Sequence, residues 1–367
     1  MRSHRTPSVP IHRRTDGATG RPGSTAPADV RSTLGAVRAA PDILCALRRV
    51  DDLLEAAARG VGTDVDLLLD AAADPSDSVT AIAAVHALGV HPADRSRAGL
   101  TALLGGSSAL QREHAAWALG RGRPHLPAVE HLVAVVAGGG FAGMLAQRTL
   151  ERWAAEEPAA VSREVRAALG TATDAGARTR LVETLGLTTC PEVVPTLRTV
   201  AGDAAEDAAT RAAAEAALAD LPPARPERRV DRRRPAGSGH GLTVAQLFLH
   251  ADIDAGLTHA GRGDTGGIAT LLVQLGDALV QGDGAVSRTL TLSRTGPDAP
   301  RPDPRSLALP GHHYLGVPLW GKPPRASAAW PLRVAARRGI RAALRAAGPV
   351  DVIHLRMADV GSLAAAE

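Results

Sequence analysis

An internal repeat between residues 41 and 221 constrains the fold of this 367-residue chain more than any other feature. Ala- and Leu-rich segments recur there with one leucine in an equivalent place, and consecutive leucines lie 31, 31, 35 and 33 residues apart. After a polar or proline-containing turn, a second apolar helical segment follows each of the first four leucines. One helix pair cannot bury its apolar face alone, so the pairs must stack. The repeated leucines are Leu88, Leu119, Leu150, Leu185 and Leu218.

The repeat resembles the short bacterial kind of HEAT-like repeat, which implies an α-solenoid over residues 41–221. The five leucines would form the spine of its core. Trp117 and Trp153 are interpreted as core or groove fillers rather than as ligand-stacking residues. Solenoids bind other macromolecules along extended concave surfaces. We therefore expect a protein partner on the solenoid, although the sequence does not identify it.

Two segments outside the repeat have compositions that oppose folding. Residues 1–40 contain Arg, Pro, Ser, Gly, Thr and Ala with hardly a large apolar side chain, so we predict a disordered tail. Residues 222–240 combine four prolines with six arginines and a Gly-Ser-Gly run, which is typical of a linker. The sequence thus divides into a tail, a solenoid, a linker and a second domain over residues 241–367.

The charge is concentrated in these two segments. Residues 1–40 carry +5 and residues 221–240 carry +4, which leaves −5 on the rest of a chain whose net charge is +4. The parts expected to fold are therefore mildly acidic, and we do not expect specific nucleic-acid binding. Cys45 and Cys190 match no disulfide or metal spacing, and no apolar run is long enough to span a membrane. The expected location is the cytoplasm.

A strand, a glycine loop and a helix follow one another between residues 243 and 280. Val244 and Leu247–Leu249 have the pattern of a buried parallel strand, and residues 268–279 have helical periodicity. Gly266 and Gly267 lie where that helix begins, with Asp264 or Thr265 placed to cap it. Bare amides at a helix N-terminus form an anion site. A tight turn without a ligand is an equally good interpretation of the glycines alone.

Two motifs in this half resemble one enzyme family. Gly263-Asp264-Thr265-Gly266-Gly267 is similar to the N-terminal glycine loop of the GT-B retaining glycosyltransferases, in the branch of sucrose synthase and sucrose-phosphate synthase. Residues 349–354 and 358–361 are similar to that family's Pro-Asp-x-Ile-His strand and Ala-Asp-x-Gly loop. The resemblance implies a Rossmann-like α/β domain, the acceptor-side half of such an enzyme.

The resemblance also implies roles for individual residues. The glycine loop, Gly263, Asp264, Thr265, Gly266 and Gly267, would bind substrate phosphate, and His354 would be the catalytic strand-end residue. Asp359 matches the Ala-Asp-x-Gly loop, and Arg356 replaces the family's usual second histidine. An arginine at this position can hold a phosphate bidentately.

Other polar residues of this half match no metal template. His250, Asp252, Asp254 and His259 are interpreted as loop residues near the acceptor pocket, and His312 and His313 as surface residues. We expect no metal and no cofactor, because the nucleotide sugar is itself the donor substrate.

The family's donor-binding half, with its Glu-x7-Glu pair, has no counterpart here, since no glutamate lies between Glu227 and Glu367. We therefore expect an α/β domain that is incomplete at its C-terminus, in a fragment of an enzyme that transfers hexose from a nucleotide sugar to a sugar or sugar-phosphate acceptor. The alternative is a non-catalytic HEAT-repeat scaffold for protein–protein interaction.

Overall fold

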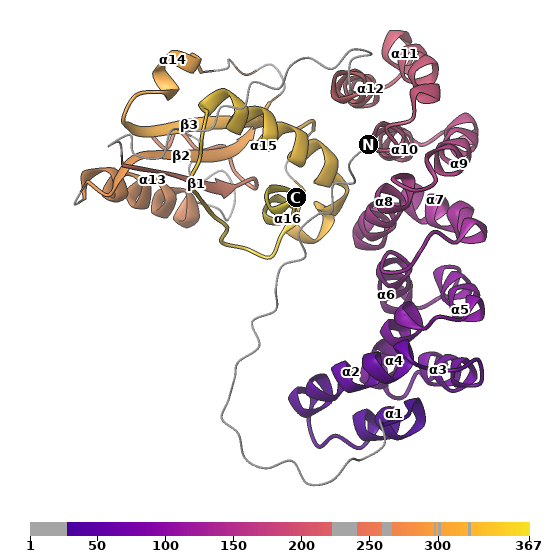
Figure 1. Ribbon diagram of the computed structural model, residues 1–367. Coiled ribbons are helices and arrows are strands. Elements are labelled where there is room, and N and C mark those ends of the chain that lie inside the picture. The colour runs from indigo at the N-terminus through magenta and orange to yellow at the C-terminus, as the bar shows by residue number, and fades with distance from the viewer. Residues whose placement is uncertain are drawn as a thin grey trace, which may run out of the picture.

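The structure, a computed structural model, describes residues 28–221 and 241–367, except for 259–265, 283, 297–298, 300–301 and 322–323. In these residues sixteen α-helices and four strands form two units (Figure 1). Helices α1–α12 make up a helical stack, and the elements from β1 to α16 make up an α/β unit. A mostly helical first part followed by a small parallel sheet agrees with the predicted order of helical repeats and then an α/β domain.

The helices of the stack form consecutive antiparallel pairs arranged in two layers (Figure 1). One layer contains the odd-numbered helices: α1 (Val30–Arg38), α3 (Asp64–Ala73), α5 (Asp94–Leu104), α7 (Val129–Gly138), α9 (Pro158–Thr171) and α11 (Val194–Gly202). The other layer contains the even-numbered helices: α2 (Ile43–Ala58), α4 (Ser78–Val90), α6 (Ala109–Leu119), α8 (Gly140–Ala154), α10 (Ala175–Leu187) and α12 (Ala208–Asp220).

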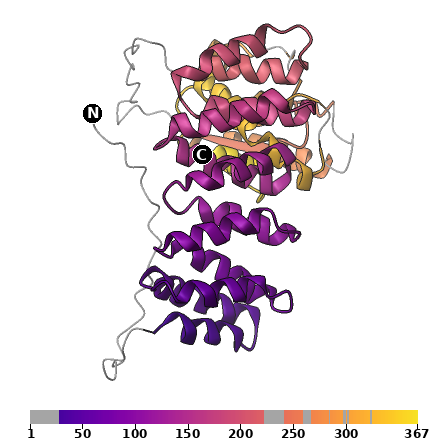
Figure 2. The ribbon, with the colours of Figure 1, turned by 90° about the vertical axis from the view of Figure 1, so that its right-hand side faces the viewer.

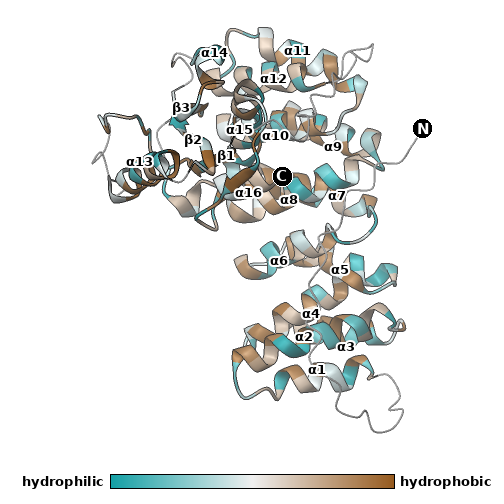
Figure 3. Ribbon diagram, turned by 60° about the vertical axis from the view of Figure 1, so that its left-hand side comes forward, coloured by the Kyte–Doolittle hydropathy of each residue, from teal (hydrophilic) through white to brown (hydrophobic). Residues whose placement is uncertain are grey.

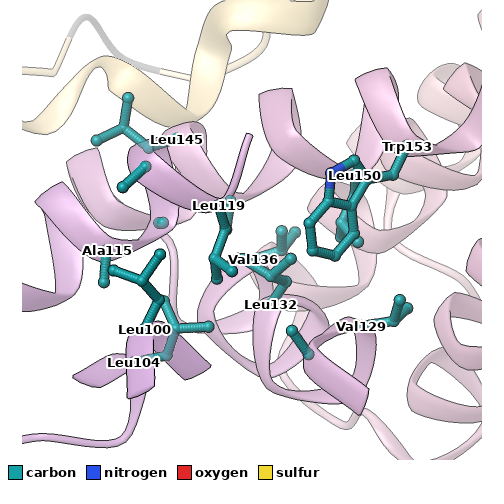
Figure 4. Close-up of a cluster of buried hydrophobic side chains, with 14 of the residues drawn as sticks. Leu100, Leu104, Ala115, Leu119, Val129, Leu132, Val136, Leu145, Leu150 and Trp153 are labelled. Carbon is teal, nitrogen blue, oxygen red and sulfur yellow. The ribbon is translucent and has the colours of Figure 1, made fainter. Parts of the chain in front are cut away.

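The repeated leucines occupy equivalent places, as predicted. Leu88, Leu119, Leu150 and Leu185 are buried between the layers on successive even-numbered helices, and Leu218 is half-buried at the end of α12. Figure 4 shows Leu119, Leu150 and Trp153 among the side chains of this core. The core runs continuously along the stack. Each pair therefore buries its apolar side chains against its neighbours.

The stack begins earlier than the sequence analysis predicted. Residues 1–27 of the predicted disordered tail lie outside the described residues, but α1 starts at Val30. The Asp29 side chain accepts a hydrogen bond from the Ser32 amide and caps this helix. Val30, Leu34 and Val37 are buried on one face against the next helix. The predicted boundary at residue 40 is wrong because this small apolar face was overlooked in a polar segment.

The sheet of the α/β unit has the order β3-β2-β1-β4, and all its strand pairs are parallel. Helices α15 and α16 cover one face, and α13 covers the other (Figure 1). The elements are β1 (Leu242–Phe248), α13 (Gly266–Gln281), β2 (Val286–Thr295), α14 (Pro304–Leu307), β3 (Gly311–Pro318), α15 (Arg333–Ala347), β4 (Val352–His354) and α16 (Val360–Ala366).

Two details of this unit differ from the sequence-based expectation. The apolar run over residues 350–355, which contains the motif strand, has the pattern of a buried strand, but it forms β4, which is exposed at the edge of the described sheet. Helix α13 begins near the predicted glycines, but its buried face contains Ala269, Leu272 and Val273, and Leu271 is 44% exposed. Gly276 is buried on the same face as these three residues and lies against the His312 ring.

The two units join along a charged seam between α15 and the even-numbered helices α8, α10 and α12. Arg333 and Arg337 each lie 2.8 Å from a carboxylate oxygen of Glu151, and Arg338 lies 2.6 Å from Asp220. Glu367, which follows α16, pairs with Arg148 at 2.7 Å. Figure 3 shows α16 beside α8 in this arrangement. None of the described helices is both long and apolar enough to cross a membrane.

Candidate functional site

The sheet topology places a ligand-binding position between β1 and β4. From β1 the chain crosses through α13 to β2 on one side, and from β3 it crosses through α15 to β4 on the other side. Because the strands are parallel, the segments that follow β1 and β4 leave the sheet at the same edge. Parallel α/β sheets bind ligands at such a topological switch point.

His250 and Asp359 meet at this edge. Nε2 of His250, which follows β1, lies 2.9 Å from Oδ2 of Asp359, which precedes α16. The other Asp359 oxygen accepts a hydrogen bond from the Ser362 amide at 2.8 Å and caps the helix. The glycine at position 361 lets the start of α16 lie close to Leu249, because a side-chain carbon at this position would lie only 3.2 Å from that leucine. The Ala-Asp-x-Gly sequence thus fixes a carboxylate beside the end of β1.

Asp359 is 8% exposed and remains ionised. Burial alone would raise the pKa of its carboxyl group, but the hydrogen bonds from His250 and Ser362 outweigh burial and lower the pKa below its ordinary value. The site therefore holds a buried negative charge next to an imidazole. Such a pair can accept hydrogen bonds from ligand hydroxyl groups.

The other predicted site residues have different placements. His354 ends β4 opposite Gln246, and both His354 and Arg356 are exposed. Gly263, Asp264 and Thr265 lie outside the described residues, as does His259. Gly266 begins α13, and a side-chain carbon at Gly267 would meet nothing within 4 Å. The structure therefore brings Asp359 together with His250 and leaves the phosphate-binding role of the glycine loop as a prediction.

His312 belongs to a buried network rather than to the surface. Its ring lies 2.8 Å from Asp277 and 2.7 Å from Thr291, whose hydroxyl also accepts a hydrogen bond from Gln246. The expectation of a surface histidine is wrong because alternation along β3 turns this ring under α13. Thr291 is fully buried within the sheet. The network therefore stabilises the contact between the sheet and α13.

A cavity of about 450 Å³ opens between the helical stack and the α/β unit, next to Asp359. We call it the seam cavity. Helices α4, α6 and α8 form one wall, and the segments around Trp330 and α16 form the other. Most of its surface is apolar. The principal lining residues are His86, His114, Trp117, Phe141, Arg148, Trp330, Asp359 and Ser362.

Two histidines in the wall of the seam cavity form a pair. His86 Nε2 lies 2.8 Å from His114 Nδ1, and the His86 ring meets Trp117 edge to face. Burial, with the nearby His114 and Arg121 charges, lowers the pKa of His86 to about 4. His86 is consequently uncharged at neutral pH.

The sequence pattern does not predict this cavity, because its walls come from two units that the proline- and arginine-rich linker separates in the chain. One signal was available. The chain has only seven aromatic residues, four Trp, two Phe and one Tyr, and three of them line the seam cavity. Phe141 and Trp330 contact each other across the seam with ring centroids 4.7 Å apart.

No family model matches the chain, and no curated protein matches it either. Among the residues that the structure describes, no three His, Cys, Asp or Glu side chains come together as metal ligands would.

Proposed function

We propose that the α/β unit is the acceptor-side domain of a retaining, nucleotide-sugar-dependent glycosyltransferase, joined to a HEAT-like α-solenoid. The observation that carries this proposal is the pairing of His250 with Asp359 at the switch point. Asp359 belongs to the motif that suggested the family, and it lies where a parallel sheet binds its ligand. The strand order β3-β2-β1-β4 also agrees with part of a Rossmann-like domain.

The residues at this edge have complementary chemistry for a sugar phosphate. The amides at the start of α13, at Gly266 and Gly267, suit a phosphate group, and the exposed guanidinium of Arg356 suits a second contact with it. His250 and Asp359 suit sugar hydroxyls. In the reaction the donor bond from the sugar C1 to the nucleotide phosphate breaks, a bond from C1 to an acceptor oxygen forms, and the acceptor proton leaves with the diphosphate. His354 keeps its proposed catalytic role at the end of β4.

Ligand-observed NMR on the 367-residue chain tests this proposal with glucose 6-phosphate, glucose and inorganic phosphate as probes. We expect weak binding of the sugar phosphate, with clearly weaker signals for glucose and phosphate. Gly267→Val should abolish the binding, because the added side chain would hold the phosphate away from the amides at the start of α13. The fold should stay intact, because a side-chain carbon at this position meets nothing within 4 Å. Arg356→Ala should weaken it about tenfold, as expected for a lost charge-assisted phosphate contact.

Matched controls are Gly35→Val, at another helical glycine with nothing within 4 Å of its would-be side-chain carbon, and Arg345→Ala, at an exposed arginine of α15. Both should bind as the wild type does. Equal binding by Gly267→Val and the wild type would contradict the proposal. In a product assay with nucleotide hexoses, we expect transfer only after a donor-binding domain with the Glu-x7-Glu pair is added.

The second candidate function is a protein-binding scaffold, and a patch on α2 favours it. Ile43, Leu44 and Leu47 are 60%, 64% and 55% exposed on one turn of this helix. Figure 1 shows α1–α3 extending beyond the α/β unit, so the patch lies on the uncovered end of the stack. Exposed apolar patches mark interaction sites. A scaffold without transferase chemistry would bind none of the three sugar and phosphate probes.

A further inference from the structure

The aromatic residues of this chain are few, and their distribution is uneven. Aromatic residues make up 2% of the sequence, yet Trp117, Phe141 and Trp330 all line the seam cavity. The cores elsewhere in the molecule consist mainly of Ala, Val and Leu, with Trp153 in the stack and Phe248 beside α13 as their buried aromatic residues among those that the structure describes. Large aromatic side chains supply broad apolar contact area and stack on flat rings. Their concentration around one cavity indicates a ligand with an aromatic ring.

The size of the cavity fits such a ligand. Small-molecule sites commonly have volumes of about 300 to 1,000 Å³ and mostly apolar walls with a few polar groups. The seam cavity has a volume of about 450 Å³. Its polar groups include Asp359 and Ser362, on the α/β side. The cavity therefore has room for a two-ring molecule with one polar end.

The charges around the cavity favour an uncharged ligand that donates a hydrogen bond. The Asp359 carboxylate and Glu113 would repel an anion. Arg148, the cation in the wall, is already paired with Glu367 at 2.7 Å. Asp359 uses one hydrogen bond on each oxygen, from His250 and Ser362, and each oxygen retains a further lone pair. A hydroxyl group fits this acceptor.

We propose that the seam cavity binds an uncharged aromatic alcohol, with its ring among Trp117, Phe141 and Trp330 and its hydroxyl on Asp359. Resting on the proposed function, this alcohol takes the acceptor position in place of a sugar acceptor, and the sugar phosphate at the glycine loop then corresponds to the phosphate-bearing sugar of the donor. The switch point and the cavity share Asp359, so an acceptor hydroxyl there lies at the edge where the sugar phosphate is expected. The helical stack then contributes one wall of the acceptor site.

Calorimetric titration of the full chain with 2-naphthol tests the cavity. Trp330→Ala should weaken binding at least tenfold, because one ring of the wall is lost. Ala358→Phe should weaken it similarly by filling the cavity from an exposed lining position, without removing any seam contact. Trp320→Ala is the matched control, because Trp320 is 41% exposed and is not among the residues that line the cavity.

Ligand analogues test the chemical class. Naphthalene-2-sulfonate, which is anionic, and naphthalene, which lacks the hydroxyl, should both bind at least five times more weakly than 2-naphthol. The inference is overturned if 2-naphthol does not bind, if the sulfonate binds equally well, or if neither variant changes the affinity.

Glucose 6-phosphate binding, measured on the same sample, separates this inference from the proposed function. If glucose 6-phosphate binds but 2-naphthol does not, the assignment of the cavity is overturned and the proposed function is not. If 2-naphthol binds but glucose 6-phosphate does not, the proposed transferase function and the acceptor role of the alcohol are overturned. The cavity is then supported as a site for an aromatic ligand.

Discussion

Arg333 on α15 and Glu151 on α8 form an ion pair at 2.8 Å, although 182 residues separate them in the chain. Arg333 is 1% exposed and also contacts Glu367 at 2.6 Å. Burial would raise the pKa of Glu151, but Arg333 and Arg337 overcome that effect and lower it. The seam therefore holds several charges away from water, and each depends on its partners.

Replacing Arg333 should lower the stability of the whole protein against unfolding. Arg333→Met leaves the half-buried carboxylate of Glu151 with Arg337 as its remaining described partner, so we expect a loss below the roughly 3 to 5 kcal/mol that breaking a fully buried pair costs. Urea unfolding followed by tryptophan fluorescence measures the loss. Arg341→Met, at an exposed position of the same helix, should change stability by less than about 0.5 kcal/mol. Equal midpoints for the two variants would refute a stabilising role for the pair.

Glu183 should make the stability of the protein depend on pH. It is buried on α10 at the seam, and burial, opposed by Arg338, Arg333 and Arg180, raises its pKa from 4.5 to about 7. Between pH 4.5 and 7 the folded chain therefore binds more protons at this site than the unfolded chain, so stability falls as pH rises through that window. The loss is on the order of 3 kcal/mol.

Glu183→Gln should remove this slope and be more stable than the wild type above pH 7. The free energy of unfolding of both proteins, measured from pH 4.5 to 8, gives the difference directly. Glu192→Gln, at an exposed glutamate, should follow the wild type in parallel. A stability difference between the wild type and Glu183→Gln that stays constant with pH would rule out the raised pKa.

Gly276→Ala should destabilise the α/β unit despite the higher helix propensity of alanine. A side-chain carbon at this position would overlap the His312 imidazole, which Asp277 and Thr291 hold in place. Overpacking costs about 1 to 3 kcal/mol, against a gain in propensity of about 1 kcal/mol. Gly267→Ala, with open space around it on the same helix, should be neutral or stabilising. Thermal unfolding of the two variants compares these effects, and an unchanged melting temperature for Gly276→Ala would contradict the expectation.

The sequence predicted those features of the fold that depend on local periodicity. The leucine spacing identified the even-numbered helices from α4 to α12, since a repeat forces equivalent residues into equivalent places. Strand β1 and helix α13 were predicted from apolar runs and glycines. Exposure of β4 was not predicted, because an apolar run indicates a strand and does not say whether a neighbour covers it. Helix α1 was missed because its apolar face has only three large residues.

The candidate site was predictable in part. Asp359 was found through its motif, and His250 was placed near the acceptor pocket, but their pairing joins residues 109 positions apart. The seam cavity depends on how α15 and α16 dock against α8, and the proline- and arginine-rich linker suggested independent units instead. Side chains such as Phe141 and Trp330 acquire a shared role only through that docking.

The α/β unit docks on α8, α10 and α12 and leaves the N-terminal helices of the stack uncovered, so the two parts of the stack should differ in how easily they bend. Repeats contact only their neighbours, so a stack bends by small rotations between adjacent pairs. The seam restrains these rotations at one end, whereas α1–α3 extend past the α/β unit (Figure 2). We therefore expect the stack to bend more easily on the N-terminal side of α8 than along the seam, and both α6 and α8 line the cavity. A load on the uncovered end would be transmitted as strain to the cavity wall.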